Sequence, residues 1–260
     1  MTMRKFFPLF ALFLLVGCAS NGGLNENPER KRQSPPPPSD SPGGPPTFQD
    51  LFNEGTLDTN VWAVSDGTWP GTNYMNPNNV DLSTGMLRIR LVVNAEAGIH
   101  AGGEISTLKA FGYGTYEWVI RTSSSSSTPY GPGSSASGSV SAGFNYINNS
   151  QTEIDALEVT GDNPSFNNMT SWTSGNTEET SSVPVPGGCD QGFHTYRIVW
   201  TASSVEFFLD GMLVHTNTKV LPATPAPVFI NHWVGNSNWG GTPTDQTSYL
   251  YCSRFTFWAL

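Results

Sequence analysis

The sequence predicts an all-β domain, built as a sandwich of two antiparallel sheets. From residue 47 onward, short runs of aromatic and β-branched residues alternate with turn-forming Gly, Asn and Asp, and helical periodicity is almost absent. Residues 47–260 are enough for one domain with a sizeable core, rather than for two small domains. Many short strands at even spacing are typical of a two-sheet sandwich.

The strand signals follow one another in a regular order. Residues 86–93 alternate between apolar and polar side chains, as a half-buried strand does. Residues 196–200 and 205–209 flank a short turn and predict a hairpin, and Asp210-Gly211 is a second turn signal. The expected strands are residues 86–93, 113–121, 196–200, 205–209, 212–215 and 249–258.

A Ser- and Gly-rich stretch, residues 122–143, interrupts this series. We expect a loop here, which is either a mobile wall of a cleft or merely a flexible surface loop. The cleft alternative arises because the stretch leads directly into the acidic segment described below.

The first 17 residues resemble an export signal. Arg4 and Lys5 precede an apolar run at residues 6–16 that is too short to span a bilayer. The run ends Leu-Val-Gly-Cys, which resembles a bacterial lipobox, in which the cysteine is acylated after cleavage; the alternative is an ordinary secretion signal. We therefore expect a lipoprotein signal peptide at residues 1–17 and a lipid on Cys18. The expected location is the cell envelope, at the outer membrane if the cell is Gram-negative.

Residues 18–46 predict a tether, because their Pro, Gly and Ser favour extended conformations and bury almost nothing. The folded domain then occupies residues 47–260. The formal net charge of −9 argues against nucleic acid as a partner, and against membrane binding other than through the lipid anchor. The charge is compatible with a neutral polysaccharide, and we expect a monomer.

Two cysteines remain once Cys18 is lipidated, namely Cys189 and Cys252. In an oxidising compartment they predict either a disulfide or two buried thiols. No CxxC motif or Cys/His cluster indicates a metal site, and no cofactor is expected.

Chemistry is concentrated in the stretch Glu-Ile-Asp-Ala-Leu-Glu at residues 153–158. In an extended strand Glu153 and Asp155 share one face, whereas a regular alternation would turn Glu158 toward the core. A buried lone carboxylate is costly. A one-residue bulge near Ala156 and Leu157 would return Glu158 to the acidic face. We therefore expect a bulged strand with three acids on one wall of a cleft.

Two glutamates that lean toward each other could approach the ~5–5.5 Å carboxyl separation of retaining glycosidases. Asp155 between them adds a like charge, which would raise a neighbour's pKa and help to keep an acid protonated. The alternative is a solvated acidic strand face, or a set of ligands for a cation.

The stretch resembles the bulged ExDxxE signature of glycoside hydrolase family 16, on the laminarinase-like side of that family. The likeness extends over nearly the whole domain. It includes Phe-Gln-Asp-Leu-Phe at residues 48–52, Phe-Gly-Tyr-Gly-Thr-Tyr-Glu at 111–117, Phe-His-Thr-Tyr at 193–196 with the Trp and Asp-Gly that follow, and residues 231–241.

The resemblance implies a concanavalin A-like β-jelly roll with the acids in an open groove. It implies that Glu153 is the nucleophile, that Asp155 tunes protonation and that Glu158 is the acid/base. The implied activity is an endo-acting, retaining hydrolysis of a β-linked polysaccharide, most simply a β-1,3- or β-1,3-1,4-glucan.

Indole rings stack on the apolar faces of sugars, so tryptophans are candidates for substrate binding. Trp239 and Trp233 lie in the segment that resembles a cleft strand, and either is a sugar platform or packs in the protein. His194 and Asn231 match family positions, and each either contacts sugar or satisfies a structural hydrogen bond. Four other tryptophans are expected in the core: Trp62, Trp118, Trp200 and Trp258.

Two positions depart from the family pattern. Phe144 stands where many members carry Trp before the catalytic strand, and we expect it to substitute in substrate binding. Tyr251 stands where many members carry an Asp associated with structural calcium, which argues against that ion. Three other functions are compatible with the same fold: an agarase, a transglycosylase, and a lectin-like module that binds cell-surface glycan without catalysis.

Overall fold

The computed structural model describes residues 42, 44–68 and 74–260. The predicted signal peptide at residues 1–17, the lipidation site Cys18 and most of the tether lie outside the described residues. The strands are β1 (Phe48–Asp50), β2 (Trp62–Val64), β3 (Gly67–Thr68), β4 (Tyr74–Met75), β5 (Val80–Asp81), β6 (Leu87–Asn94), β7 (Ile99–Thr107), β8 (Gly114–Ser124), β9 (Ser139–Ile147), β10 (Thr152–Thr160), β11 (Phe166–Ser174), β12 (Thr177–Pro184), β13 (His194–Trp200), β14 (Val205–Leu209), β15 (Met212–Asn217), β16 (Val228–Val234) and β17 (Gln246–Ala259). A short 3-10 helix, η1 (Pro77–Asn79), precedes β5.

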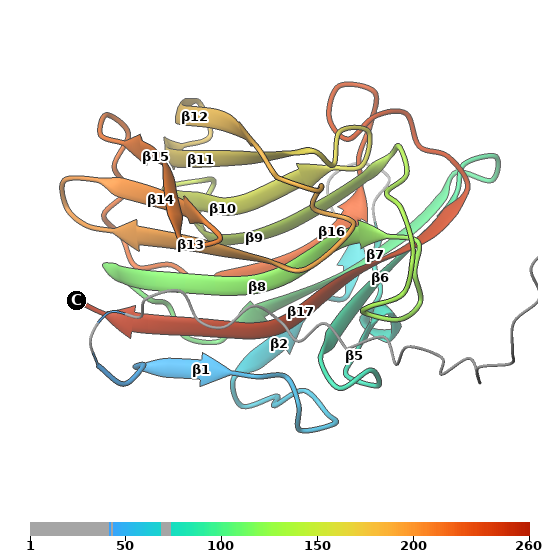
Figure 1. The fold of residues 1–260 in the computed structure, drawn as a ribbon, viewed down its shortest axis with the longest axis horizontal. Helices are drawn as coiled ribbons and strands as arrows, with labels where there is room; N and C mark the ends of the chain where they lie inside the picture. The colour runs from blue at the N-terminus through green and yellow to red at the C-terminus, as the bar shows by residue number, and fades with distance from the viewer. Residues whose placement is uncertain (1–41, 43, 69–73) are drawn as a thin grey trace, which may run out of the picture. The chain divides into compact units, whose positions relative to one another are not determined.

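The strands form the predicted pair of antiparallel sheets (Figure 1). The first sheet has the order β12-β11-β10-β9-β16-β7-β2, so β10 lies near its middle. The second sheet has the order β15-β14-β13-β8-β17, and β6 and β1 then pair with successive parts of the long β17. The β6–β7 hairpin joins the two sheets, and one short pairing, β4 with β7, is parallel.

The core is built from the inward-facing residues of alternating strands. In β6, every second side chain from Leu87 to Val93 is buried, which is the period of two that the sequence predicts. Trp62, Trp118 and Trp200 are fully buried and Trp258 is nearly so, and this confirms their assignment to the core.

Cys189 and Cys252 are both free, buried thiols, so the structure contradicts the disulfide alternative. The two sulfurs lie in separate surroundings: the thiol of Cys189 faces the carbonyl of Phe166, and that of Cys252 faces the carbonyl of Arg254. Burial raises the pKa of Cys189 to about 12, so this thiol stays protonated and unreactive near neutrality.

The predicted loop at residues 122–143 is shorter than expected, because β8 continues to Ser124 and β9 already begins at Ser139. The remaining loop, residues 125–138, is held by the buried guanidinium of Arg121. This group donates to the carbonyls of Pro129 and Gly131 at 2.9 and 2.8 Å. The loop is therefore fastened to β8, and it does not line the cleft described below.

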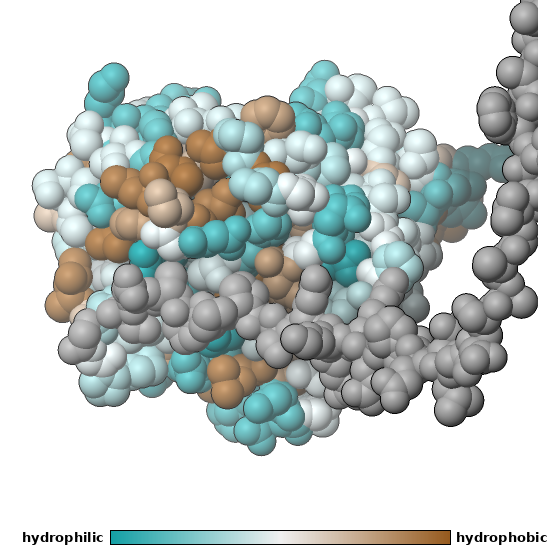
Figure 2. Space-filling model, in the orientation of Figure 1, coloured by the Kyte–Doolittle hydropathy of each residue, from teal (hydrophilic) through white to brown (hydrophobic). Residues whose placement is uncertain are grey.

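Apolar side chains are also exposed on the second sheet. Met212 and Leu213 on β15 are 70% and 54% exposed. Figure 2 shows apolar residues gathered over the side of the molecule where β14 and β15 are drawn in Figure 1. The acids of residues 153–158 belong to the other sheet. Among the described residues, no helix is long and apolar enough to cross a membrane.

Candidate active site

A bulge at Ala156 brings the three acids to one face of β10. Asp155 pairs with Phe144 on β9 and Leu157 pairs with the preceding residue, Gly143, so Ala156 is the extra residue. The register shifts at the same place on the β11 side. Glu153, Asp155 and Glu158 therefore line one cleft, as predicted, while Ile154, Leu157 and Val159 are fully buried in the core.

Asn167 on β11 stabilises the bulge. A bulge interrupts the ladder and leaves backbone groups without their usual partners. The amide nitrogen of Asn167 donates to the carbonyl of Ala156, and its amide oxygen accepts from the N–H of Glu158, both at 3.0 Å. The side chain is only 1% exposed. One buried amide thus replaces the missing ladder contacts and fixes the backbone of Glu158.

We expect Asn167→Ala to lower the free energy of unfolding by about 2–3 kcal/mol, because it leaves two buried backbone groups unpaired. We also expect a lower kcat, since Glu158 loses its backbone anchor. Urea unfolding and steady-state kinetics measure the two effects. Asn168→Ala is the matched control, because its neighbouring amide donates only to the carbonyl of Glu158. Equal stability losses in the two variants would contradict the assignment.

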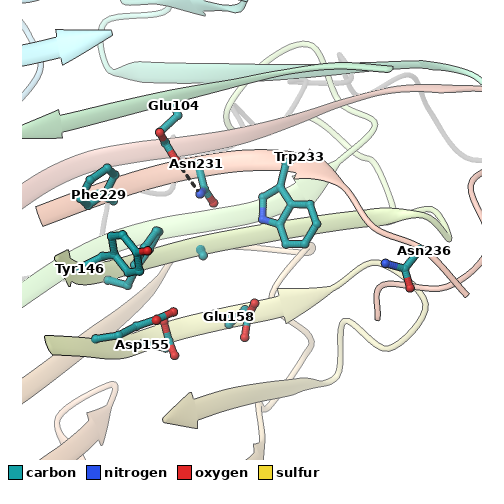
Figure 3. A pocket seen from close by; sticks show the side chains of 11 residues that line it. Glu104, Tyr146, Asp155, Glu158, Phe229, Asn231, Trp233 and Asn236 are labelled. Carbon is teal, nitrogen blue, oxygen red and sulfur yellow. Dashed lines mark hydrogen bonds between the residues drawn. The ribbon is translucent and has the colours of Figure 1, made fainter. Parts of the chain in front are cut away.

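The cleft has a volume of about 620 Å³ and is formed by four neighbouring strands and one turn (Figure 3). Its residues lie on β7, β9, β10, β16 and the turn that follows β16. The lining residues are Glu104, Ala142, Phe144, Tyr146, Glu153, Asp155, Glu158, Phe229, Asn231, Trp233 and Asn236.

Each of the three acids accepts a hydrogen bond from a different donor. The Ser150 hydroxyl donates to Glu153. The indole N–H of Trp172, on β11, donates to Oδ2 of Asp155 at 3.2 Å. The indole N–H of Trp239 donates to Oε1 of Glu158 at 3.0 Å. The acids are therefore individually oriented rather than spread over a solvated strand face.

The three carboxyl groups have raised pKa values because the cleft removes them from water. Burial raises the pKa of Glu158 to about 7, the hydrogen bond from Trp239 opposes the rise, and the charge of Glu153 adds to it. Burial raises the pKa of Glu153 as well, against the hydrogen bond from Ser150. An acid that is half-protonated near neutrality can both give and accept a proton.

The sequence predicts that the charge of Asp155 raises the pKa of a neighbouring acid, but the structure indicates the reverse. Burial, followed by the charges of Glu158 and Glu153, holds the pKa of Asp155 itself well above its usual range. The like charge that raises the pKa of Glu158 comes from Glu153. Asp155 is only 5% exposed, so its neutral form is favoured.

The structure brings most of the predicted binding residues to the cleft. Phe144, Asn231 and Trp233 line it, and Trp239 contacts it through Glu158. His194 is not among the lining residues. It lies on β13 in the other sheet, and its Nδ1 is 2.7 Å from Oδ2 of Asp210.

Asp210 explains the position of His194. Asp210 lies in the turn between β14 and β15 with a positive φ of 49°. Its other carboxylate oxygen accepts from the N–H of Thr195. The histidine therefore fastens a turn to a strand, which is the structural alternative given above for this position.

The sequence did not single out Glu104 on β7. Its carboxylate is 3% exposed and accepts from the Ser65 hydroxyl at 2.7 Å and from the amide of Asn231 at 3.0 Å. Burial raises its pKa. A glutamate beside Ile105 in an otherwise uncharged strand was the sequence signal that could have indicated this site. Its partner Asn231, however, lies 127 residues away in the chain.

Tyr146 and Phe229 were also missed. Together with Phe144 they form an aromatic cluster at one end of the cleft (Figure 3), in which the rings of Phe144 and Phe229 stack with centroids 5.2 Å apart. Such a surface can pack against the apolar face of a sugar ring. Aromatic residues are common in all strands of this domain, so the sequence gave no reason to prefer these two.

Known proteins resemble this chain in sequence. Residues 59–251 match the family model of glycosyl hydrolases family 16. The chain is 32% identical over 209 residues to the endo-1,3-1,4-β-glycanase ExoK of Rhizobium meliloti (strain 1021), covering 75% of this chain and 72% of that protein. It is 28% identical over 197 residues to a β-glucanase of Bacillus subtilis (strain 168), with 73% and 75% covered.

Solved structures share the fold. The β-glucanase of Bacillus licheniformis superimposes with a TM-score of 0.70 at 24% identity, over 82% of this chain and 98% of that one. The laminarinase catalytic domain of Thermotoga petrophila RKU-1 gives a TM-score of 0.69 at 20% identity, over 82% and 96%. These likenesses confirm the predicted β-jelly roll. The family match over residues 59–251 and the 32% identity to ExoK establish that the chain belongs to glycoside hydrolase family 16 and is a glycoside hydrolase.

Proposed function

We propose that the protein is an endo-acting, retaining hydrolase of a β-glucan, with Glu153 as nucleophile and Glu158 as acid/base. The observation that carries the proposal is the bulge at Ala156, which places both carboxyl groups in one cleft. The pKa of Glu158, about 7, supports its role as the acid/base, because a general acid must be protonated at the working pH.

The reaction follows in two balanced steps. The ionised Glu153 attacks the anomeric carbon while Glu158 gives its proton to the glycosidic oxygen, so that one C–O bond forms and one breaks. Glu158, now ionised, then takes a proton from water as the water oxygen displaces Glu153 from the same carbon. Two inversions retain the anomeric configuration and return both acids to their starting states.

Asp155 assists by remaining uncharged. A negative charge on Asp155 would oppose ionisation of Glu153, which the first step requires. Burial and the neighbouring charges of Glu158 and Glu153 raise the pKa of Asp155 and so favour its neutral form, and the indole of Trp172 holds its position.

The substrate is a neutral polymer. No Lys or Arg side chain is among the described residues that line the cleft, so it offers no cation to pair with a sulfated or carboxylated chain, and the ionised Glu153 disfavours one. Phe144, Trp233 and Asn231 serve as sugar contacts. The buried Oδ1 of Asn231 has no hydrogen-bond partner among the described residues, and it can accept from a sugar hydroxyl. The names of the relatives favour β-1,3-1,4- or β-1,3-glucan, and the bulge favours the laminarinase-like type.

Incubation of the folded domain with laminarin, lichenan, agarose and carboxymethylated β-glucan tests the proposal. We expect new reducing ends from laminarin or lichenan and a rapid fall in viscosity, which marks internal cleavage. Proton NMR of the first products should show the β-anomer, as retention requires. Cleavage of agarose alone would indicate an agarase, and products longer than the substrate would indicate transglycosylation. Binding without any cleavage would leave a lectin-like module.

We also propose that the enzyme is lipid-anchored to the cell envelope through Cys18 and acts there as a monomer. The lipobox-like run and the Pro-rich segment that follows it support the anchor, and the cleft is complete within one chain.

In a Gram-negative host fed an alkyne-tagged fatty acid, the parent chain should carry the label and partition into a detergent phase. Cys18→Ser should lose the label. Cys189→Ser is the matched control and should keep it, because that thiol is buried in the folded domain. Equal labelling of the parent and Cys18→Ser would overturn the anchor.

A further inference from the structure

The turn after β16 holds Trp239 in a fixed position. The backbones of Asn236 and Trp239 exchange two hydrogen bonds, of 2.7 and 2.9 Å. Gly235 and Gly240 are required here: a Cβ on Gly235 would lie 2.3 Å from the carbonyl oxygen of Trp239, and Gly240 has a φ of +92°. Gly138 joins both glycines, donating to the carbonyl of Gly240 at 2.7 Å and accepting from the N–H of Gly235 at 3.0 Å.

The fixed indole meets Glu158 through its edge. Its Nε1 lies 3.0 Å from Oε1 of Glu158, and the residue is 36% exposed. A sugar platform uses the face of the ring, whereas this contact uses the N–H. An indole N–H can only donate, so Oε1 must act as an acceptor in every protonation state of Glu158. The proton of the neutral acid is thereby confined to Oε2.

We propose that Trp239 is a positioning residue for Glu158: its indole N–H occupies Oε1, stabilises the ionised carboxylate, and leaves Oε2 as the oxygen that exchanges the proton with the substrate. This inference rests on the proposed acid/base role of Glu158. It assigns Trp239 a part in proton transfer, where the sequence indicated only a sugar contact or packing.

Several other groups share the cleft with Glu158. The titratable groups lining the cleft with it are Glu153 and Asp155 on its own strand, Glu104 on β7 and Tyr146 on β9. Strand β16 contributes neutral side chains to the lining, and Asn168 on β11 donates to the backbone carbonyl of Glu158. The indole of Trp239 donates to the Glu158 carboxylate itself.

The hydrogen bond itself is tested on the unliganded enzyme by NMR. The indole ¹H–¹⁵N signal of Trp239, identified by its loss in Trp239→Phe, should shift with pH with a midpoint near that of the Glu158 carboxyl carbon. The shift should vanish in Glu158→Gln. An indole signal that does not respond to pH in the parent chain would overturn the proposal. This readout needs no catalysis, so it stands even if turnover assigns another residue as the acid/base.

The catalytic consequence is tested by replacing Trp239 with benzothienylalanine, an isostere with sulfur in place of the N–H, and by Trp239→Phe. We expect the alkaline limb of the kcat/KM profile to move up by about 0.5–1 pH unit, because the ionised form of Glu158 loses a donor. The value of kcat at neutral pH should fall about tenfold, and KM should change less than twofold in the isostere.

Trp233→Phe is the matched control, since it alters the other cleft tryptophan. It should change KM and leave the alkaline limb in place. An unmoved limb with a raised KM in the benzothienylalanine enzyme would show that Trp239 is a sugar platform and would reject the positioning role.

Discussion

The Glu158→Ala and Glu153→Ala variants are each expected to hydrolyse polysaccharide about 10³-fold or more slowly than the parent chain. The two losses have different physical causes. Without Glu158 no group protonates the leaving oxygen or deprotonates water, whereas without Glu153 no glycosyl-enzyme forms. Reducing-end assays measure both losses. Glu206→Ala, which removes a carboxylate from β14 in the other sheet, is the matched control and should keep full activity.

Azide separates the two roles. With an aryl β-oligoglucoside whose leaving group needs no protonation, azide can enter the space that either alanine vacates. In Glu158→Ala it should attack the glycosyl-enzyme and give the β-azide by two inversions. In Glu153→Ala it should attack the substrate directly and give the α-azide by one inversion. The opposite stereochemistry in the two variants would exchange the assigned roles.

Glu158 also affects the stability of the folded protein. Burial holds the pKa of Glu158 at about 7, above the ordinary glutamate value that applies in the unfolded chain. Between those two values the folded state binds more protons than the unfolded state, so stability falls as the pH rises through this window. Glu158→Gln should therefore unfold at a higher temperature than the parent at pH 8, and the difference should shrink below pH 5. Such a result would also show that lost activity is not lost folding.

The acidic stretch was predictable because a local steric rule applied to it. Strand alternation put Glu153 and Asp155 on one face, and only an extra residue could bring Glu158 there without burying it in the core. The structure has that extra residue at Ala156. The core tryptophans and the hairpin at residues 196–209 were predictable for a similar reason, because strand alternation and turn-forming residues are local features of the sequence.

The partners of the acids were not predictable in this way. Trp239 and Glu158 are 81 residues apart, and Glu104 and Asn231 are 127 apart. Their contact depends on which strands become neighbours and on a register that one residue can reverse. His194 illustrates the same limit, because a family position in the sequence does not tell which of the two sheets a strand joins.

The loop at residues 125–138 was predicted, but its order was not: composition indicated a flexible segment, whereas the buried cation of Arg121 holds it. The guanidinium of Arg121 is 1% exposed. Besides the carbonyls of Pro129 and Gly131, it donates to the carbonyl of Asp190 and to the hydroxyl of Ser124. A Ser- and Gly-rich loop has few apolar side chains to bury, so these polar contacts supply much of its order.

Arg121→Met is therefore expected to lower the free energy of unfolding by about 3–5 kcal/mol, since methionine fills part of the space but leaves several buried acceptors unpaired. Arg88→Met is the matched control. Its guanidinium pairs with Asp81 at 2.8 Å in a partly exposed site, where the two side chains are 24% and 33% exposed, and the loss should be about 1 kcal/mol or less. Urea unfolding of the two variants gives the comparison, and equal losses would contradict the role of Arg121.

The Arg121→Met substitution should also affect catalysis in the cleft. Gly138, at the end of the same loop, bonds to Gly235 and Gly240 in the turn that carries Trp239, and the Ser137 hydroxyl donates to the carbonyl of Thr242. If the loop loosens, the indole of Trp239 loses part of its support, and the alkaline limb of the kcat/KM profile should shift in the direction expected for Trp239→Phe. Hydrogen exchange should then increase more in residues 125–138 and 235–241 than in β9, β10 and β16 of the first sheet. Faster exchange in the loop with an unmoved pH profile would mean that the turn keeps Trp239 in place without it.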